Sequence, residues 1–125
     1  GLEDQFRFTG LLEGRRKQEA FAGAELFILP THSENFGMVI AEALACGVPA
    51  LVTDTTPWHA LNRNGGGWCC PWSDYRDRLR LALATSYDEL AERGHIARRW
   101  MQADYSWAQT AATLSAFYSQ LLASR

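Results

Sequence analysis

The apolar and polar positions of the first two-thirds of the chain predict alternating strands and helices. Uninterrupted apolar runs at 26–29 and 50–52 are typical of strands covered on both faces of a parallel sheet. The alternating segment 6–9 predicts a further strand that ends in a turn at Gly10. Apolar residues recur on one side of a short predicted helix over 17–24. The expected fold class is therefore α/β.

The segment 33–54 combines a polar turn, a helical pattern, a helix stop and a buried strand. The helix is predicted to begin near Gly37, where the missing side chain lets another group approach the backbone closely. The free N–H groups of its first turn would point toward an anion such as phosphate. Gly47 and Pro49 are expected to end this helix. The polar turn follows a predicted strand, and open α/β sheets bind ligands at the carboxyl ends of their strands.

Two carboxylates, Glu34 and Glu42, stand eight positions apart around the predicted helix start. Glu42 is predicted to lie beside Met38, at the edge of an apolar stripe that packs on the sheet. That stripe consists of Val39, Ile40, Ala43 and Leu44. A half-sheltered carboxylate needs hydrogen-bond donors, and sugar hydroxyls would provide them. Glu34 taken alone is also explained as a surface carboxylate that favours a helix N-terminus.

Other residues near this turn have two explanations each. His32 would contact a bound phosphate or sugar, or form a local hydrogen bond. Ser33 is expected to cap the helix in preference to contacting a ligand. Phe36 is expected to fix the turn as an apolar plug rather than to serve as a stacking platform. The cations at 15–17 are expected to form a solvated surface, with phosphate attraction as the alternative.

From Pro71 onward the chain is predicted to be helical. Ser73, Ser86 and Ser106 are the predicted N-caps, and the last two have Glu89 and Gln109 at the spacing of a capping box. The predicted inward-facing residues are Tyr75, Leu79, Ala82 and Leu83 in the first helix, Leu90, Ala97, Trp100 and Met101 in the second, and Trp107, Ala111, Leu114, Tyr118 and Leu121 in the third. The aromatic residues among them are expected to form core rather than to contact a cofactor.

Length and composition limit the possible classes of protein. A chain of 125 residues, 47% of them hydrophobic, suffices for one domain with a small core. The net charge is −2 with both signs interspersed, so a nucleic-acid partner is not expected. Neither a transmembrane run nor a signal peptide is apparent, which favours a cytoplasmic location. Cys46, Cys69 and Cys70 lack metal-ligand spacing and are predicted to be buried thiols.

The motif formed by Glu34, the seven residues NFGMVIA and Glu42 resembles the signature of retaining glycosyltransferases of family 4. The resemblance extends from 8–10 through 24–30 to the helix that begins at Trp107, and so covers nearly the whole chain. It implies a Rossmann-like parallel sheet with flanking helices, as the truncated C-terminal half of a two-domain GT-B enzyme. Residues 1–125 would then be one nucleotide-sugar-binding domain, with the N-terminal acceptor domain absent. In such relatives the final helix can cross back to that absent domain, so part of its apolar stripe is expected to be exposed.

The resemblance also implies an activity and a role for each candidate residue. The activity is transfer of a sugar from a nucleoside diphosphate sugar to an acceptor, with retention of the anomeric configuration. Glu34 and Glu42 are the implied catalytic pair, holding the sugar ring and the ribose respectively without reacting themselves. Donor contacts are implied for the backbone of Asn35, Phe36, Gly37 and Met38, and for His32. The backbone near Leu12 would meet the base, with simple core coverage by this leucine as the alternative.

No cofactor and no metal are expected. The expected partners are the nucleotide sugar and, through the absent domain, an acceptor glycan or lipid. Peripheral contact with the inner membrane face is left open for the full-length protein, and the isolated chain is expected to be inactive. Two alternatives are a GT-B-like epimerase or phosphorylase half and a non-catalytic nucleotide-sugar-binding module. The base, the sugar, the acceptor and the oligomeric state do not follow from the sequence.

Overall fold

The structure, a computed structural model, describes residues 1–124 and contains three strands, which form one parallel sheet. The strands are β1 (Phe27–Leu29), β2 (Ala50–Thr53) and β3 (Gly67–Cys70), and β2 lies between the other two. Because the strands are parallel, Pro30, Asp54 and Pro71 follow them at one edge of the sheet, called the carboxyl edge below. The predicted α/β class and both predicted strands are confirmed. The central strand β2 is fully buried as expected, whereas the edge strand β1 is only partly covered, with Ile28 45% exposed.

Six α-helices and two short 3-10 helices complete the described part of the chain. The α-helices are α1 (Gly14–Ala22), α2 (Met38–Ala45), α3 (Leu61–Asn64), α4 (Tyr75–Leu83), α5 (Tyr87–Asp104) and α6 (Trp107–Ala123), and the 3-10 helices are η1 (Glu3–Gln5) and η2 (Trp72–Asp74). The first α-helix begins three residues before its predicted start at Lys17 and ends two residues before its predicted end at Ala24.

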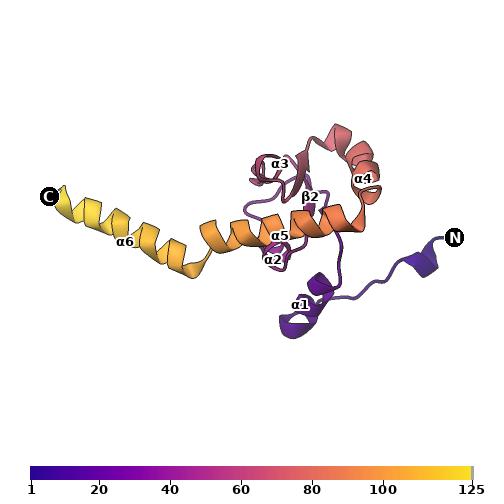
Figure 1. Cartoon of the computed structure of the whole chain (residues 1–125), viewed down its shortest axis with the longest axis horizontal. Helices are drawn as coiled ribbons and strands as arrows, with labels where there is room; N and C mark the ends of the chain where they lie inside the picture. Colours follow the sequence, from indigo (N-terminus) through magenta and orange to yellow (C-terminus); the bar gives the residue numbers. More distant parts are fainter. Residues whose placement is uncertain (125) are drawn as a thin grey trace.

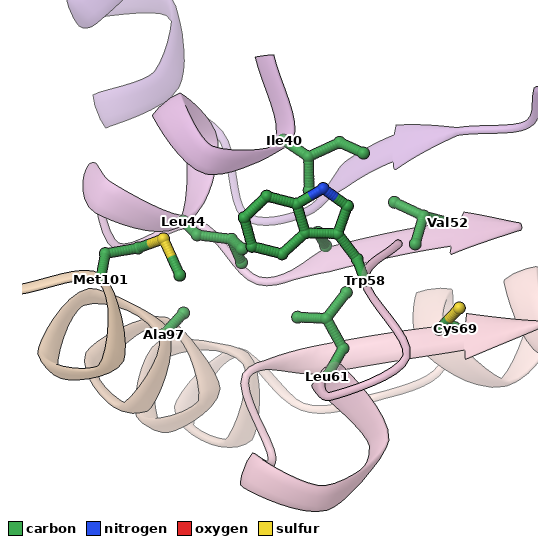
Figure 2. Close-up of a cluster of buried hydrophobic side chains, with 9 residues drawn as sticks. Ile40, Leu44, Val52, Trp58, Leu61, Cys69, Ala97 and Met101 are labelled. Carbon is green, nitrogen blue, oxygen red and sulfur yellow. The ribbon is translucent and has the colours of Figure 1, made fainter. Parts of the chain in front are cut away.

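The sheet has helices on both faces. The larger apolar cluster joins α2, α3 and α5 to one face (Figure 1), and its members are Ile40, Leu44, Ala50, Val52, Trp58, Leu61, Cys69, Ala97 and Met101. Figure 2 shows the Trp58 indole among side chains from α2, α3 and α5. A smaller cluster on the other face joins α4 to the sheet through Leu51, Cys70, Tyr75 and Ala82. The phenol of Tyr75 also donates a hydrogen bond to the Leu51 carbonyl at 3.1 Å.

Two glycines set the close crossing of α2 and α5. Gly47, with φ +81°, follows α2, and the N–H of Val48 returns to the carbonyl of Ala43 as in a Schellman motif. A side chain on Gly94 of α5 would collide with the carbonyl oxygen of Gly47. The glycine inside α5 costs helix propensity, and the close approach of the two backbones explains its presence.

The sequence prediction was wrong for the segment 6–9. This segment forms no strand, and Phe8 is 97% exposed. The described sheet offers it no neighbouring strand, because β1, β2 and β3 pair only with one another. Alternation of side chains alone does not create a strand where the backbone has no partner.

Of the three helix caps predicted after Pro71, two are confirmed. At the starts of α5 and α6, the hydroxyls of Ser86 and Ser106 accept hydrogen bonds from the N–H groups of Glu89 and Gln109 respectively. Ser73 is not a cap, because it lies inside η2 and donates to the carboxylate of Asp74.

Several predicted inward-facing residues are not buried. Leu83, at the end of α4, is 69% exposed, although its neighbour Ala82 is buried. No residue of α6 up to Ser124 is buried, and Trp107 is 90% exposed. Figure 1 shows α6 continuing away from the sheet beyond α5. The prediction that its stripe forms core was therefore wrong for this chain, and exposure of part of the stripe was correctly expected.

Candidate functional site

The start of α2 lies at the carboxyl edge of the sheet, and the segment 30–37 connects it to the end of β1. Gly37 is its N-cap and has the left-handed φ of +77°. A β-carbon there would lie 2.7 Å from Cδ1 of Ile40 and 3.2 Å from Cγ of Glu34. This position therefore requires glycine, and the Glu34 side chain folds directly over it.

Ser33 does not cap α2, contrary to the sequence prediction. The Ser33 hydroxyl accepts no hydrogen bond from α2. The Ser33 N–H donates to Oγ1 of Thr31, and the Thr31 hydroxyl donates to the Ser33 carbonyl. Three residues of the turn, Glu34, Asn35 and Phe36, separate Ser33 from Gly37 and place the Ser33 hydroxyl out of reach of the first helical N–H groups. The N–H groups of Met38 and Val39 have no partner within the helix because of their position.

Glu34 is half-buried, and its Oε1 accepts the N–H of Asn35 at 3.0 Å. Asn35, Phe36 and Met38 are exposed. The carboxylate and the first free N–H groups of α2 thus lie on a short, accessible stretch of chain.

The Trp58 side chain packs against the turn that precedes α2. Its Nε1 donates to the carbonyl of Phe36 at 2.6 Å, and the two ring centroids lie 5.2 Å apart. The Phe36 ring also lies near Tyr105, with a centroid distance of 6.2 Å. These contacts are those of an apolar plug that fixes the turn, whereas a donor contact for Phe36 stays a prediction.

Glu42 lies on α2, at the edge of the buried apolar stripe of this helix. Ile40, Ala43 and Leu44 are buried, and the Glu42 side chain is 37% exposed, as expected for a half-sheltered carboxylate. Its Oε1 accepts a hydrogen bond from Nζ of Lys17 at 2.7 Å. Sequence reasoning missed this partner, which comes from α1.

Glu42 also lines a mainly apolar cavity of about 340 Å³ between α2 and the end of α5. The other lining residues are Ala41, Ala45, Met101, Gln102, Tyr105 and Ser106. Glu34 is not among them, so this cavity is not shared by the two carboxylates.

Threonine hydroxyls join the ends of β1 and β2 at the carboxyl edge. The hydroxyls of Thr53 and Thr55 both donate to the carbonyl of Thr31, at 2.7 and 2.6 Å. The N–H of Thr31 approaches Thr53 Oγ1 at 3.2 Å. This network fixes the segment that leads into Glu34, and sequence reasoning did not identify it.

His32 is exposed at the same edge and stacks on Trp72, with ring centroids 4.0 Å apart. Trp72 follows β3, so the stack joins the first strand end to the third. Leu12 is half-buried in the segment before α1, whereas Leu11 is exposed. The donor roles predicted for His32 and Leu12 stay predictions.

The thiols do not form a reactive site. Cys69 and Cys70 are buried as predicted, Cys46 is half-buried, and all three are free. Burial raises the pKa of the Cys69 thiol to about 11 and also raises the pKa of the Cys70 thiol.

Within residues 1–124, no three histidine, cysteine or acidic side chains form a metal-binding group. Over the same residues, no helix has the length and apolar character needed to cross a membrane.

Comparison with known proteins gives consistent matches over most of the chain. Residues 1–100 match the family model described as "Glycosyl transferases group 1". The chain is 31% identical to a D-inositol 3-phosphate glycosyltransferase of Gordonia bronchialis, over 99% of this chain and 28% of that protein. It is 26% identical to a phosphatidyl-myo-inositol mannosyltransferase of Mycobacterium leprae, over 99% of this chain and 34% of that protein.

A solved structure shares the fold. Sucrose-phosphate synthase from Thermosynechococcus elongatus matches with a TM-score of 0.68 and 25% sequence identity, over 85% of this chain and 27% of that one. The chain therefore spans between 27% and 34% of the length of these three proteins.

Proposed function

The chain belongs to the glycosyl transferases group 1 family, and from this membership we propose that it is the donor-binding, C-terminal part of a retaining glycosyltransferase of family 4. Its α/β fold is GT-B-like and Rossmann-like. The proposed reaction moves a sugar from a nucleoside diphosphate sugar to an acceptor and keeps the anomeric configuration. The observation that carries the proposal is the start of α2, where Glu34 folds over a required glycine at the carboxyl edge and Glu42 follows on the same helix.

The site residues have complementary proposed roles. Glu42 accepts hydrogen bonds from the ribose hydroxyls, and Glu34 accepts them from hydroxyls of the donor sugar ring. The backbone N–H groups between Asn35 and Met38 meet the sugar or the distal phosphate. The N-terminus of α2 adds its partial positive charge to this part of the site.

The chemistry follows from the leaving group. Departure of the nucleoside diphosphate places negative charge on phosphate oxygens and positive character on the anomeric carbon. Fixed N–H donors near the phosphate oxygens lower the barrier, because they need no reorganisation as this charge develops. Glu34 and Glu42 act by holding the donor, and no cofactor or metal is part of the proposal.

The acceptor is proposed to be a glycan or a lipid, bound by a domain outside this chain. The relatives' names include an inositol phosphate and a phosphatidyl-inositol, which do not by themselves select between these classes. A cytoplasmic location, with or without peripheral membrane contact, stays a prediction from the sequence.

Titration of a panel of nucleotide sugars into the full-length protein tests the proposal. We expect saturable binding of one donor, and a loss of affinity of about tenfold or more for Glu34→Ala and Glu42→Ala, as expected when hydrogen bonds to a charged group are removed. Glu25→Ala is the matched control, because Glu25 is exposed and precedes β1 at the opposite edge of the sheet.

Three results would contradict the proposal or one of its parts. Absence of binding by every nucleotide sugar would contradict donor binding. Equal affinity of the two site variants and the control would contradict the assigned site and favour a binding module that uses another surface. Epimerised donor, or a sugar phosphate formed with inorganic phosphate, would replace glycosyl transfer by epimerase or phosphorylase chemistry.

A further inference from the structure

The ion pair between Lys17 and Glu42 differs from every other ion pair described for residues 1–124. It joins side chains 25 positions apart and connects α1 to α2. The other pairs each lie within a single helix or within the first residues of the chain. The Lys17–Glu42 pair is therefore a tertiary contact, at a residue proposed to bind the donor.

The fold brings Lys17 to this place through the apolar face of α1. Phe21 lies four positions after Lys17 and hence on the same side of the helix. Its ring packs edge-on against Phe27 of β1, with centroids 6.0 Å apart. This contact directs the Lys17 side of α1 toward the sheet and α2.

The geometry leaves both partners able to contact a ligand. Lys17 and Glu42 are 35% and 37% exposed. An ammonium group has three N–H donors, of which the pair uses one. The second carboxylate oxygen of Glu42, Oε2, has no hydrogen-bond partner among the described residues. One free acceptor thus lies beside free donors.

We infer that Lys17 is a positioning residue of the donor site, which holds the Glu42 carboxylate for the vicinal diol of the nucleotide ribose. This inference rests on the proposed function. One ribose hydroxyl would donate to Oε2 of Glu42, while Lys17 fixes Oε1 and offers a further N–H to a ribose oxygen. Lys17 also compensates the charge of Glu42 when the bound nucleotide excludes water, which an isolated carboxylate would resist.

Calorimetric titration of the full-length protein with the diphosphates of uridine, guanosine and adenosine tests this role. The diphosphate that binds most tightly is then compared with its 2′-deoxy and 3′-deoxy forms. We expect Lys17→Met to weaken binding of the ribose form by about tenfold, the loss of one charge-assisted hydrogen bond. Lys17→Arg should recover most of this loss, because it restores the cation.

The deoxy forms separate a role at the ribose from a general structural role. If Lys17 acts through the diol, Lys17→Met changes the affinity of at least one deoxy form by less than twofold. An equal tenfold loss for the ribose form and for both deoxy forms would overturn the inference. Arg16→Met is the control, because Arg16 is an exposed cation on the same helix without an ion pair among the described residues.

Failure of the inference and failure of the proposed function give different results. If Glu42→Gln weakens binding and Lys17→Met behaves like Arg16→Met, the inference is wrong and the proposed function stands. If none of the diphosphates binds the wild-type protein, the proposed function fails and the inference fails with it. Lys17→Gln repeats the test should the methionine variant not fold.

Discussion

At the scale of single residues, Gly37 has a left-handed backbone, and a β-carbon there would come 2.7 Å from Cδ1 of Ile40. Gly37→Ala is therefore expected to lower the free energy of unfolding by about 1–3 kcal/mol, from backbone strain and from the displacement of Ile40. Urea denaturation followed by circular dichroism measures the change. Donor affinity should fall as well, because Glu34 rests on this glycine.

Gly23 provides the matched control for this substitution. It has φ −90°, and a β-carbon there would meet only the Glu19 carbonyl oxygen at 3.5 Å and that of Ala20 at 4.0 Å, which are ordinary contacts. Gly23→Ala should change the stability by less than about 0.5 kcal/mol. Equal losses for the two variants would show that the left-handed turn at Gly37 is not required.

Cys69 makes the stability depend on alkaline pH. Burial raises the pKa of its thiol from 9.0 to about 11. The folded state thus keeps a proton that the unfolded state loses, so the stabilisation is complete below about pH 9 and is lost as the pH rises toward 11. The expected loss reaches up to about 3 kcal/mol across this interval.

Urea denaturation at several pH values between 8 and 11 would measure this dependence. Cys69→Ala removes the titrating thiol, so its stability should fall less steeply with pH than that of the wild-type chain, whatever its stability at pH 8. Parallel slopes for the two proteins would mean that another group causes the alkaline loss.

At the scale of elements, Trp58 connects the start of α2 to the end of α5. It is 1% exposed, donates to the Phe36 carbonyl at 2.6 Å, and packs against Trp100 and Tyr105. Trp58→Phe removes the donor and leaves a gap, with an expected loss of about 2–4 kcal/mol in unfolding free energy. Donor affinity should fall with it, because the turn before α2 loses its support.

Trp100→Phe is the control for the indole hydrogen bond. Its Nε1 donates to Asp104 on the exposed surface of the same helix at 2.9 Å. That exposed bond contributes less than about 1 kcal/mol, so Trp100→Phe, which also loses part of the ring contact with Trp58, should destabilise the chain less than Trp58→Phe and leave donor affinity unchanged. A Trp58→Phe protein as stable as Trp100→Phe would contradict the supporting role of Trp58.

The elements that sequence reasoning identified are those with strong local patterns. The apolar runs of β1 and β2 and the glycine stop of α2 determine their own structure. β3 was not predicted as a strand, because a glycine-rich turn leads directly into its four residues. There the close approach of Gly67 to Ala50 of β2, a tertiary contact, is decisive.

In the candidate site, too, the local features could be predicted from the sequence and the tertiary contacts could not. The spacing of Glu34 and Glu42 around Gly37 is a local feature of the sequence, and the half-buried state of Glu42 followed from the helical period. Lys17 could not be assigned to Glu42, since their contact depends on how α1 packs on β1. The threonine network of β1 and β2 likewise depends on strand pairing.

At the scale of the whole molecule, the buried core ends at Met101, and α6 adds no buried side chain up to Ser124. Its exposed apolar residues are Trp107, Leu114, Phe117, Tyr118, Leu121 and Leu122. The hydrophobic stabilisation of the domain therefore comes from the sheet and from α2 to α5. Helix α6 contributes solvent-exposed apolar surface instead.

A truncation series tests this division of the molecule. A chain that ends at Ser106 should have a free energy of unfolding within about 1 kcal/mol of that of the 125-residue chain, because the removed helix buries no side chain. A chain that ends at Trp100 also loses Met101, which is 4% exposed, and the Tyr105 ring that packs on Trp58, so it should lose about 2–5 kcal/mol. Urea denaturation at matched protein concentration measures both free energies of unfolding.

The truncation at Ser106 should also reduce self-association in analytical ultracentrifugation, since it removes the apolar stripe of α6. If the chain that ends at Ser106 is already unfolded without urea, then α6 stabilises the domain through contacts that the side-chain burial does not reveal.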